Sequence, residues 1–169
     1  MLKVLGSEVI VAAHENTGML TLVNGRKIYL KGSDRPDTLR GVGLAYCVID
    51  EYASIKPQVW ETIIRPALAD VKGGALFIGT PAGRNHFYDL YEYAEDSGDA
   101  EWAAFHYTSF DNPFLDPTEI EAAKKTLSTF AFRQEFLSSF EAAASDVFKD
   151  EWIKFSEDEP KDGDFYMRS

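Results

Sequence analysis

The chain has 169 residues, of which 45% are hydrophobic and 27% charged; this fits a single globular domain and excludes extensive disorder away from the termini. The formal net charge of -11 argues against broad, nonspecific nucleic-acid binding, because phosphate contacts need clustered Lys and Arg. Cys47 is the only cysteine, which excludes an internal disulfide and indicates a reducing compartment. No run approaches the roughly 18 apolar residues of a membrane span, and the first residues lack a signal-peptide pattern, so we expect a cytosolic protein with no membrane partner.

The first predicted element is a β-hairpin over residues 20–31, LTLVNGRKIYLK. Two alternating segments flank Asn24-Gly25, a dipeptide preferred in type I′ hairpin turns. The next stretch, residues 32–43, is rich in Gly, Asp and Pro and is typical of a loop.

Two short apolar runs, residues 44–49 and 74–79, lack the alternation of a half-exposed strand and predict strands buried on both faces. Between them, residues 57–71 have helical spacing that Pro66 interrupts, which predicts a kink or two short helices. Similar patterns follow: we expect helices over 86–95, 117–127 and 129–140, and a strand over 102–108.

Four aromatic side chains near the end of this region predict a core stripe rather than a base-stacking platform. They are Phe130, Phe132, Phe136 and Phe140. After residue 144 the chain becomes polar; residues 156–164 indicate an exposed acidic linker, and residues 165–167 have the pattern of a new strand.

The alternation of strands and helices predicts an α/β fold with a largely parallel sheet. Ligands of such sheets bind beyond the carboxyl ends of the strands. Asp50-Glu51 and Thr80 follow two neighbouring strands, so we expect them at the same edge of the sheet.

A strand that ends in Asp50-Glu51 has the Walker B arrangement. There the first carboxylate binds Mg²⁺, usually through water, and the second polarises the attacking water as a general base. The alternative is that the pair merely caps a strand or begins a helix. In many P-loop motors a Thr placed like Thr80 senses the γ-phosphate, and a strand-terminating turn is the alternative at this position.

Two arginines in loops, Arg40 and Arg84, could each contact a phosphate as an arginine finger, or face solvent. The histidines are scattered and, with the single cysteine, form no metal-ligand spacing. They are His14, His86 and His106. The sequence also lacks the Gly-x-Ser-x-Gly elbow of a hydrolase triad.

Six segments, in this order, resemble motifs of the ATPase domain of the large terminase subunit of tailed bacteriophages. They are NGRKIYLKGSDRPDTLRGVG, YCVIDEYA, WETIIRPALAD, LFIGTPAGRNHFYDLY, SFDNPFLD and AFRQEFLSSF. The resemblance covers roughly residues 20–150, and the combination of VIDEYA with IGTPAGRNHFY is its most specific part.

The resemblance implies an ATP-driven DNA-packaging motor that acts with other terminase subunits, the portal protein and double-stranded DNA. It implies that Asp50 is the Mg²⁺-associated aspartate and Glu51 the catalytic glutamate. It implies that Gly79, Thr80 and Pro81 form the motif that couples hydrolysis to motion. Arg40 matches an arginine proposed to act on the ATP of a neighbouring subunit. The resemblance places the protein in the bacterial cytoplasm and transiently at the viral procapsid portal.

The sequence departs from the family pattern in two places. It contains no Gly-x-x-x-x-Gly-Lys-[Ser/Thr] loop, so the amides and lysine that hold the β- and γ-phosphates are missing, and it ends where the first strand of the nuclease domain is expected. We therefore predict a partial P-loop NTPase (RecA-like) fold with a mainly parallel sheet plus a β-hairpin. Residues 1–150 form the partial ATPase domain, and residues 151–169 form the acidic linker and the start of the nuclease domain.

The leading hypothesis is a fragment of a packaging motor that needs a separate ATPase segment to bind ATP and Mg²⁺ well and to hydrolyse ATP. One alternative is a non-catalytic interaction module or decayed terminase remnant, in which the acidic pair is structural. Another is a fragment of a different P-loop enzyme such as a helicase, for which we expect a more basic surface.

Overall fold

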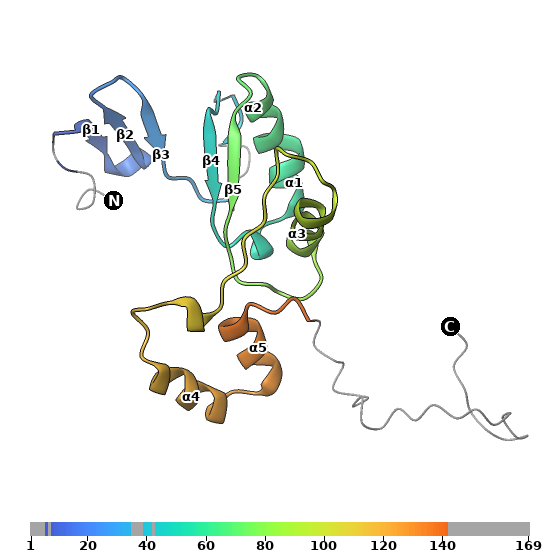
Figure 1. Cartoon of the computed structure of the whole chain (residues 1–169). Helices are drawn as coiled ribbons and strands as arrows, with labels where there is room; N and C mark the ends of the chain where they lie inside the picture. The colour runs from blue at the N-terminus through green and yellow to red at the C-terminus, as the bar shows by residue number, and fades with distance from the viewer. Residues whose placement is uncertain (1–5, 7, 35–38, 42, 142–169) are drawn as a thin grey trace, which may run out of the picture. The chain divides into compact units, whose positions relative to one another are not determined.

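The computed structural model describes residues 6, 8–34, 39–41 and 43–141. These residues belong to two compact units, residues 1–80 and 81–169, which are treated separately below (Figure 1). No helix among the described residues is long and apolar enough to span a membrane.

An antiparallel three-stranded sheet begins the first unit. It contains β1 (Ile10–His14), β2 (Met19–Leu22) and β3 (Lys27–Tyr29) in that order. The expected hairpin is confirmed between β2 and β3, but its turn is not of type I′. Gly25 alone of the expected pair has positive φ, 79°, and its amide donates to the Leu22 carbonyl at 2.9 Å. The Leu22 amide in turn donates to the Arg26 carbonyl at 2.8 Å. The loop therefore consists of residues 23–25, with Gly25 in the left-handed conformation. Three-residue loops of this kind are the commonest hairpin connections after the two-residue turns.

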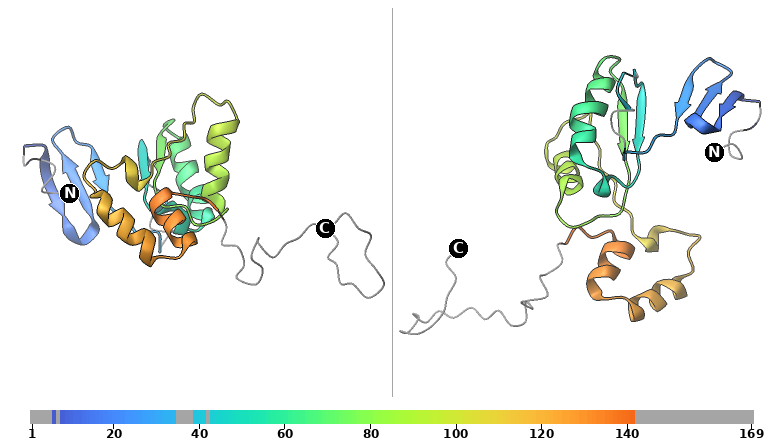
Figure 2. Two further views of the ribbon diagram at one scale, coloured as in Figure 1. Left: turned by 60° about the horizontal axis from the view of Figure 1, so that its bottom comes forward. Right: turned by 180° about the vertical axis from the view of Figure 1, so that it is seen from behind.

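The second sheet contains β4 (Tyr46–Ile49) and β5 (Gly74–Phe77), paired in parallel with Ile49 opposite Phe77. One helical run connects them: α1 (Pro57–Val59), the π-helical segment η4 (Trp60–Ile64) and α2 (Arg65–Ala69). The run lies along the sheet (Figures 1 and 2). Its inward side chains and those of the sheet form a small core whose buried members are Ile49, Tyr52, Val59, Ile63, Ile64 and Leu68.

The interruption expected at Pro66 takes the form of the π-helical turn η4 rather than a break in the run. Proline has no amide hydrogen and its ring clashes with the carbonyl four residues earlier in a regular α-helix. The wider turn over Trp60–Ile64 precedes Pro66, which lies in the first turn of α2.

β4 and β5 were expected to be buried on both faces, and this expectation is wrong. Four apolar side chains, here called the open face, are exposed: Tyr46 59%, Val48 55%, Leu76 40% and Ile78 44%. Their neighbours Cys47, Ile49, Ala75 and Phe77 are more buried, because the helical run covers only that side of the sheet. The strands therefore alternate in exposure although both faces are apolar.

The second unit contains α3 (His86–Asp96), η5 (Ser109–Asp111), α4 (Pro117–Thr126) and α5 (Thr129–Leu137). The three predicted helices are confirmed, each preceded by a side-chain cap: Asn85, Asp116 and Ser128 accept from backbone amides of the first turn. The strand expected over residues 102–108 is not formed. This segment has no ladder partner among the described residues, and its Phe105 and Tyr107 are exposed.

The predicted aromatic stripe is only partly buried. Phe132 is 7% exposed and its ring stacks on Phe136 at 5.2 Å. Phe140 contacts three rings of α3, those of Phe87, Tyr88 and Tyr91. Phe130 is 37% exposed and departs from the prediction, because α5 turns this position toward solvent. The predicted domain boundary at residue 150 and the acidic linker lie outside the described residues.

Candidate functional site

The carboxyl ends of β4 and β5 lie side by side, as predicted for a parallel pair. The Ile78 amide donates to the Ile49 carbonyl at 2.9 Å, and the Tyr52 amide donates to the Ile78 carbonyl at 3.0 Å. These two bonds bring Asp50 and Glu51, which follow β4, next to Gly79, which follows β5.

Glu51 leaves the strand in an unusual backbone conformation. Its φ of 51° and ψ of 42° lie in the left-handed region, which is uncommon for a residue other than Gly. Its amide donates to Oδ1 of Asp50 at 3.1 Å. Both carboxylates lie on exposed residues, so a ligand can reach them from solvent.

Gly79 packs against the peptide that joins Glu51 to Tyr52. A Cβ at Gly79 would lie 3.2 Å from the Tyr52 nitrogen and 3.3 Å from Cα of Glu51, closer than side chains normally pack. Thr80 is half-buried and Pro81 is buried. The first two residues of the predicted coupling motif, Gly79 and Thr80, thus lie beside the acidic pair, with Gly79 in contact.

The two candidate arginines are placed differently from the acidic pair. Arg40 is exposed and belongs to the segment that enters β4 at its amino end, so the strand end that carries Asp50 does not position it. The guanidinium of Arg84 lies 5.3 Å from the ring centre of Tyr88, a cation–π contact within the second unit.

The carboxylates of Asp50 and Glu51 could contribute ligands to a metal ion. The described residues contain no group of three or more His, Cys, Asp or Glu side chains that could hold a metal ion. Mg²⁺ in nucleotide sites is commonly held by one or two carboxylates plus phosphate oxygens and waters. Two exposed, adjacent carboxylates therefore fit a magnesium ion shared with a nucleotide and do not form a complete cage.

The sequence prediction missed Tyr52, which is 2% exposed. Its ring meets that of Phe77 edge-on at 4.7 Å, and Phe77 meets Trp60 at the same distance. Burial, with a smaller effect of Glu61, raises the pKa of Tyr52 to about 12, so its hydroxyl stays protonated at neutral pH. The only available signal was an aromatic residue directly after an acidic pair, which by itself specifies no role.

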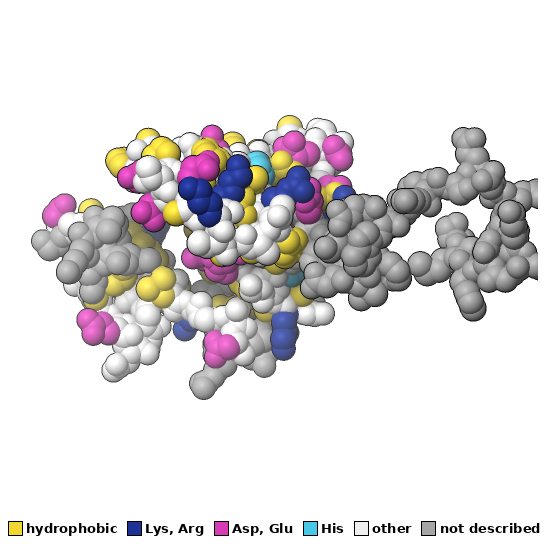
Figure 3. Space-filling view, turned by 90° about the horizontal axis from the view of Figure 1, so that it is seen from below, with side chains coloured by type: hydrophobic (Ala, Val, Ile, Leu, Met, Phe, Trp, Pro, Cys, Tyr) yellow, Lys and Arg dark blue, Asp and Glu magenta, His cyan; other side chains and the backbone are white. Residues whose placement is uncertain are grey.

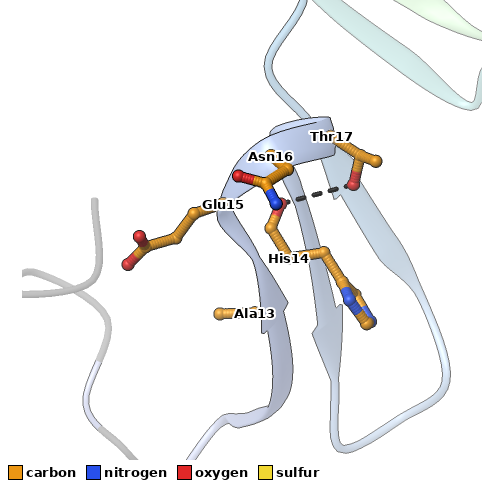
Figure 4. A pocket seen from close by; sticks show the side chains of 5 residues that line it. All are labelled: Ala13, His14, Glu15, Asn16 and Thr17. Atoms are coloured by element: carbon orange, nitrogen blue, oxygen red, sulfur yellow. Dashed lines mark hydrogen bonds between the residues drawn. The ribbon is translucent and has the colours of Figure 1, made fainter.

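Two other surface features lie apart from these residues. A pocket lined by Ala13, His14, Glu15, Asn16 and Thr17 lies where β1 joins η1 (Figure 4). It contains none of the predicted site residues. On the face shown in Figure 3, Lys and Arg side chains are interspersed with Asp and Glu, which does not provide the continuous basic surface that broad nucleic-acid binding needs.

A family model for the N-terminal part of the terminase large subunit, T4likevirus-type, matches residues 6–155. The large terminase subunit of Escherichia phage T5 is 32% identical over 131 residues, which cover 76% of this chain and 30% of that protein. The large subunit of Thermus virus P23-45 is 33% identical over 134 residues, covering 70% of this chain and 27% of that protein. The chain thus spans less than a third of the length of these relatives.

Solved structures give the same assignment. The large terminase ATPase domain of Thermus phage P74-26 superimposes with a TM-score of 0.66 at 26% identity, over 79% of this chain and 64% of that one. A large terminase from a thermophilic bacteriophage, solved in complex with ADP, has a TM-score of 0.61 at 23% identity, over 77% of this chain and 33% of that one, and shares the fold. The chain belongs to the terminase large-subunit family, and its described residues have the fold of part of a terminase ATPase domain.

Proposed function

We propose that this chain supplies the Walker B pair and coupling motif of a phage DNA-packaging ATPase and hydrolyses ATP only when a phosphate-binding segment completes the site. The observation that carries this proposal is the pair of hydrogen bonds through Ile78, which brings two exposed carboxylates beside Gly79 and Thr80. Membership of the terminase large-subunit family supports it.

We assign a role to each of the predicted site residues. Asp50 would hold Mg²⁺ through a bound water, and Glu51, exposed at the strand end, would accept a proton from the attacking water. A bound magnesium ion would supply positive charge that offsets the charge developing on the phosphate. Gly79 transmits displacement of Thr80 to the Glu51–Tyr52 peptide, because the two backbones are in contact. Arg40, carried by a different loop, acts on the nucleotide of a neighbouring subunit.

The open face is where the rest of the ATPase domain packs. Parallel sheets are almost always covered on both faces, and Tyr46, Val48, Leu76 and Ile78 expose apolar surface instead. The chain matches only 64% of a solved terminase ATPase domain. We therefore assign to this face the unmatched part of such a domain, including its phosphate-binding loop, in the same or another polypeptide.

In the assembled motor the partners are other terminase subunits, the nuclease domain, the portal protein and double-stranded DNA, and the site of action is the procapsid portal. The net charge of -11 favours DNA contacts through other parts of such an assembly rather than through this chain.

The test compares ATP binding and turnover of the wild-type chain and Glu51→Gln with Mg²⁺. Each is assayed alone and joined to a terminase segment that carries a Gly-x-x-x-x-Gly-Lys-[Ser/Thr] loop, with cooperative unfolding checked for every protein. We expect negligible turnover by the chain alone, turnover by the joined protein, and loss of turnover but not of nucleotide binding in joined Glu51→Gln. Turnover by the chain alone would contradict the need for a second segment.

The alternative function is a non-catalytic interaction module. In that case the joined protein folds and binds nucleotide, and Glu51→Gln changes neither its ATP binding nor its turnover.

A further inference from the structure

The end of β4 contains a one-residue bulge opposite Ile78. Ile49 pairs with Phe77, so in a regular parallel ladder the partner of Ile78 is Asp50, and the Ile78 carbonyl accepts from the next amide, that of Glu51. It accepts from Tyr52 instead, at 3.0 Å, while the Ile78 amide keeps its regular bond to Ile49. One extra residue is therefore inserted between the two hydrogen bonds that Ile78, the residue after β5, makes to this segment.

Glu51 is the residue that the bulge displaces from the ladder. Its amide turns back to Asp50 Oδ1, and its backbone adopts φ 51°, a left-handed value that is uncommon for a residue other than Gly. A left-handed Glu is disfavoured by its Cβ and persists only where the surrounding contacts impose it.

Tyr52 provides those contacts. It begins η3 (Tyr52–Ser54), its amide makes the bond that closes the bulge, and its ring is buried against Phe77. Phe77 is the last residue of β5 and Ile78 follows it, so the ring contact and the backbone bond tie Tyr52 to two adjacent residues at the end of that strand. With Ile49 bonded to the same strand, both flanks of Asp50-Glu51 are fixed while the two carboxylates remain exposed.

We propose that Tyr52 is a positioning residue that, by burying its ring on Phe77, holds the bulge and turns the Glu51 carboxylate out of the strand toward the nucleotide. The catalytic role of Glu51 rests on the proposed function above; the positioning by Tyr52 does not. Bulges next to active sites commonly re-aim a side chain in this way.

The test measures strain at position 51 in the chain itself, without nucleotide. Glu51→Gly and Glu51→Ala are compared by urea unfolding; Gly tolerates the left-handed conformation and Ala does not. We expect the unfolding equilibrium constant of Glu51→Gly to be about threefold or more below that of Glu51→Ala. The same comparison is repeated with Tyr52→Leu, which keeps an apolar side chain without the ring, and with Tyr52→Phe as the matched control.

The Gly–Ala difference is expected to persist with Tyr52→Phe and to disappear with Tyr52→Leu, because the residue at position 51 is then no longer held in the left-handed region. A role of Tyr52 in stability alone would lower the stability of all Leu variants equally and leave the Gly–Ala difference unchanged, which would overturn the proposal. If Tyr52→Leu does not fold, amide hydrogen exchange of the wild-type chain decides: protection of the Tyr52 amide equal to that of Ile78 supports the proposal, and exchange at the rate of an open amide overturns it.

The two proposals fail separately. Loss of the Gly–Ala difference with Tyr52→Leu, together with full ATP turnover by joined Glu51→Gln, would leave the positioning intact and remove the catalytic role. If instead the Gly–Ala difference is unchanged by Tyr52→Leu and turnover is abolished in joined Glu51→Gln, the catalytic role of Glu51 stands and the positioning role of Tyr52 is removed.

Discussion

Gly79 and Glu51 are in backbone contact at the ends of two neighbouring strands: a Cβ at Gly79 would lie 3.3 Å from Cα of Glu51. The contact links the residue after β5 to the exposed carboxylate after β4, with no side chain in between. A displacement of the backbone at Gly79 therefore acts directly on the backbone at Glu51.

We predict that Gly79→Ala destabilises the first unit by about 1–3 kcal/mol, because the added methyl group overpacks against the Glu51–Tyr52 peptide. The measurement is urea unfolding of the purified chain. Gly43→Ala is the matched control, since a Cβ there meets nothing within 4 Å, and it should change the free energy of unfolding by less than about 1 kcal/mol. Equal effects of the two substitutions would show that Gly79 is not closely packed.

Val48→Thr and Ile49→Thr are predicted to differ although the two positions are adjacent in β4. Val48 is 55% exposed on the open face and Ile49 is 4% exposed, and Thr suits a strand at both. Val48→Thr should alter the free energy of unfolding by about 0.5 kcal/mol or less. Ile49→Thr should lower it by about 2–4 kcal/mol, since it removes buried carbon and buries a hydroxyl. A large loss for Val48→Thr in urea unfolding would mean that another part of the chain covers the open face.

Local patterns were enough to predict much of the fold. The helix α3 could be located from its regular apolar spacing, and α4 from Asp116 and Pro117 at its start. The hairpin followed from Asn24-Gly25, although the turn type did not, because the loop length depends on how Leu22 pairs with Arg26. The neighbouring strand ends followed from the rule for parallel sheets.

Other features depend on contacts that a sequence pattern does not specify. An apolar run such as that of β4 indicates side chains suited to burial, yet not whether the covering elements belong to the same chain, so the exposure of Val48 was not predicted. The bulge at Glu51 depends on which amide reaches the Ile78 carbonyl. Tyr52 was missed for the same reason, since its importance comes from its contact with Phe77.

The N-cap of α4 is predicted to make part of the stability depend on acidic pH. Hydrogen bonds from the Thr118 amide and hydroxyl hold the pKa of Asp116 below its ordinary value of 3.8. A lowered pKa in the folded state means that this contribution is fully present above the ordinary pKa and is lost as pH falls through the folded value. Asp116→Asn should retain the cap without this dependence. Thermal unfolding measured between neutral pH and pH 2 checks this: the wild type should lose more stability below pH 3.8 than Asp116→Asn, and parallel curves would contradict it.

Cys47 is predicted to react slowly in the folded chain and to report opening of the helical run. Burial raises the pKa of its thiol, which reduces the reactive thiolate, and Cys47 lies on the side of β4 that the run covers. As the only cysteine, it allows labelling with iodoacetamide to be followed by mass without ambiguity. Labelling at pH 8 should be slower than in urea-unfolded chain. It should accelerate in Leu68→Ala, because Leu68 is 1% exposed and the cavity destabilises the run by about 2–5 kcal/mol. Equal labelling rates in folded and unfolded chain would show that the run does not cover Cys47.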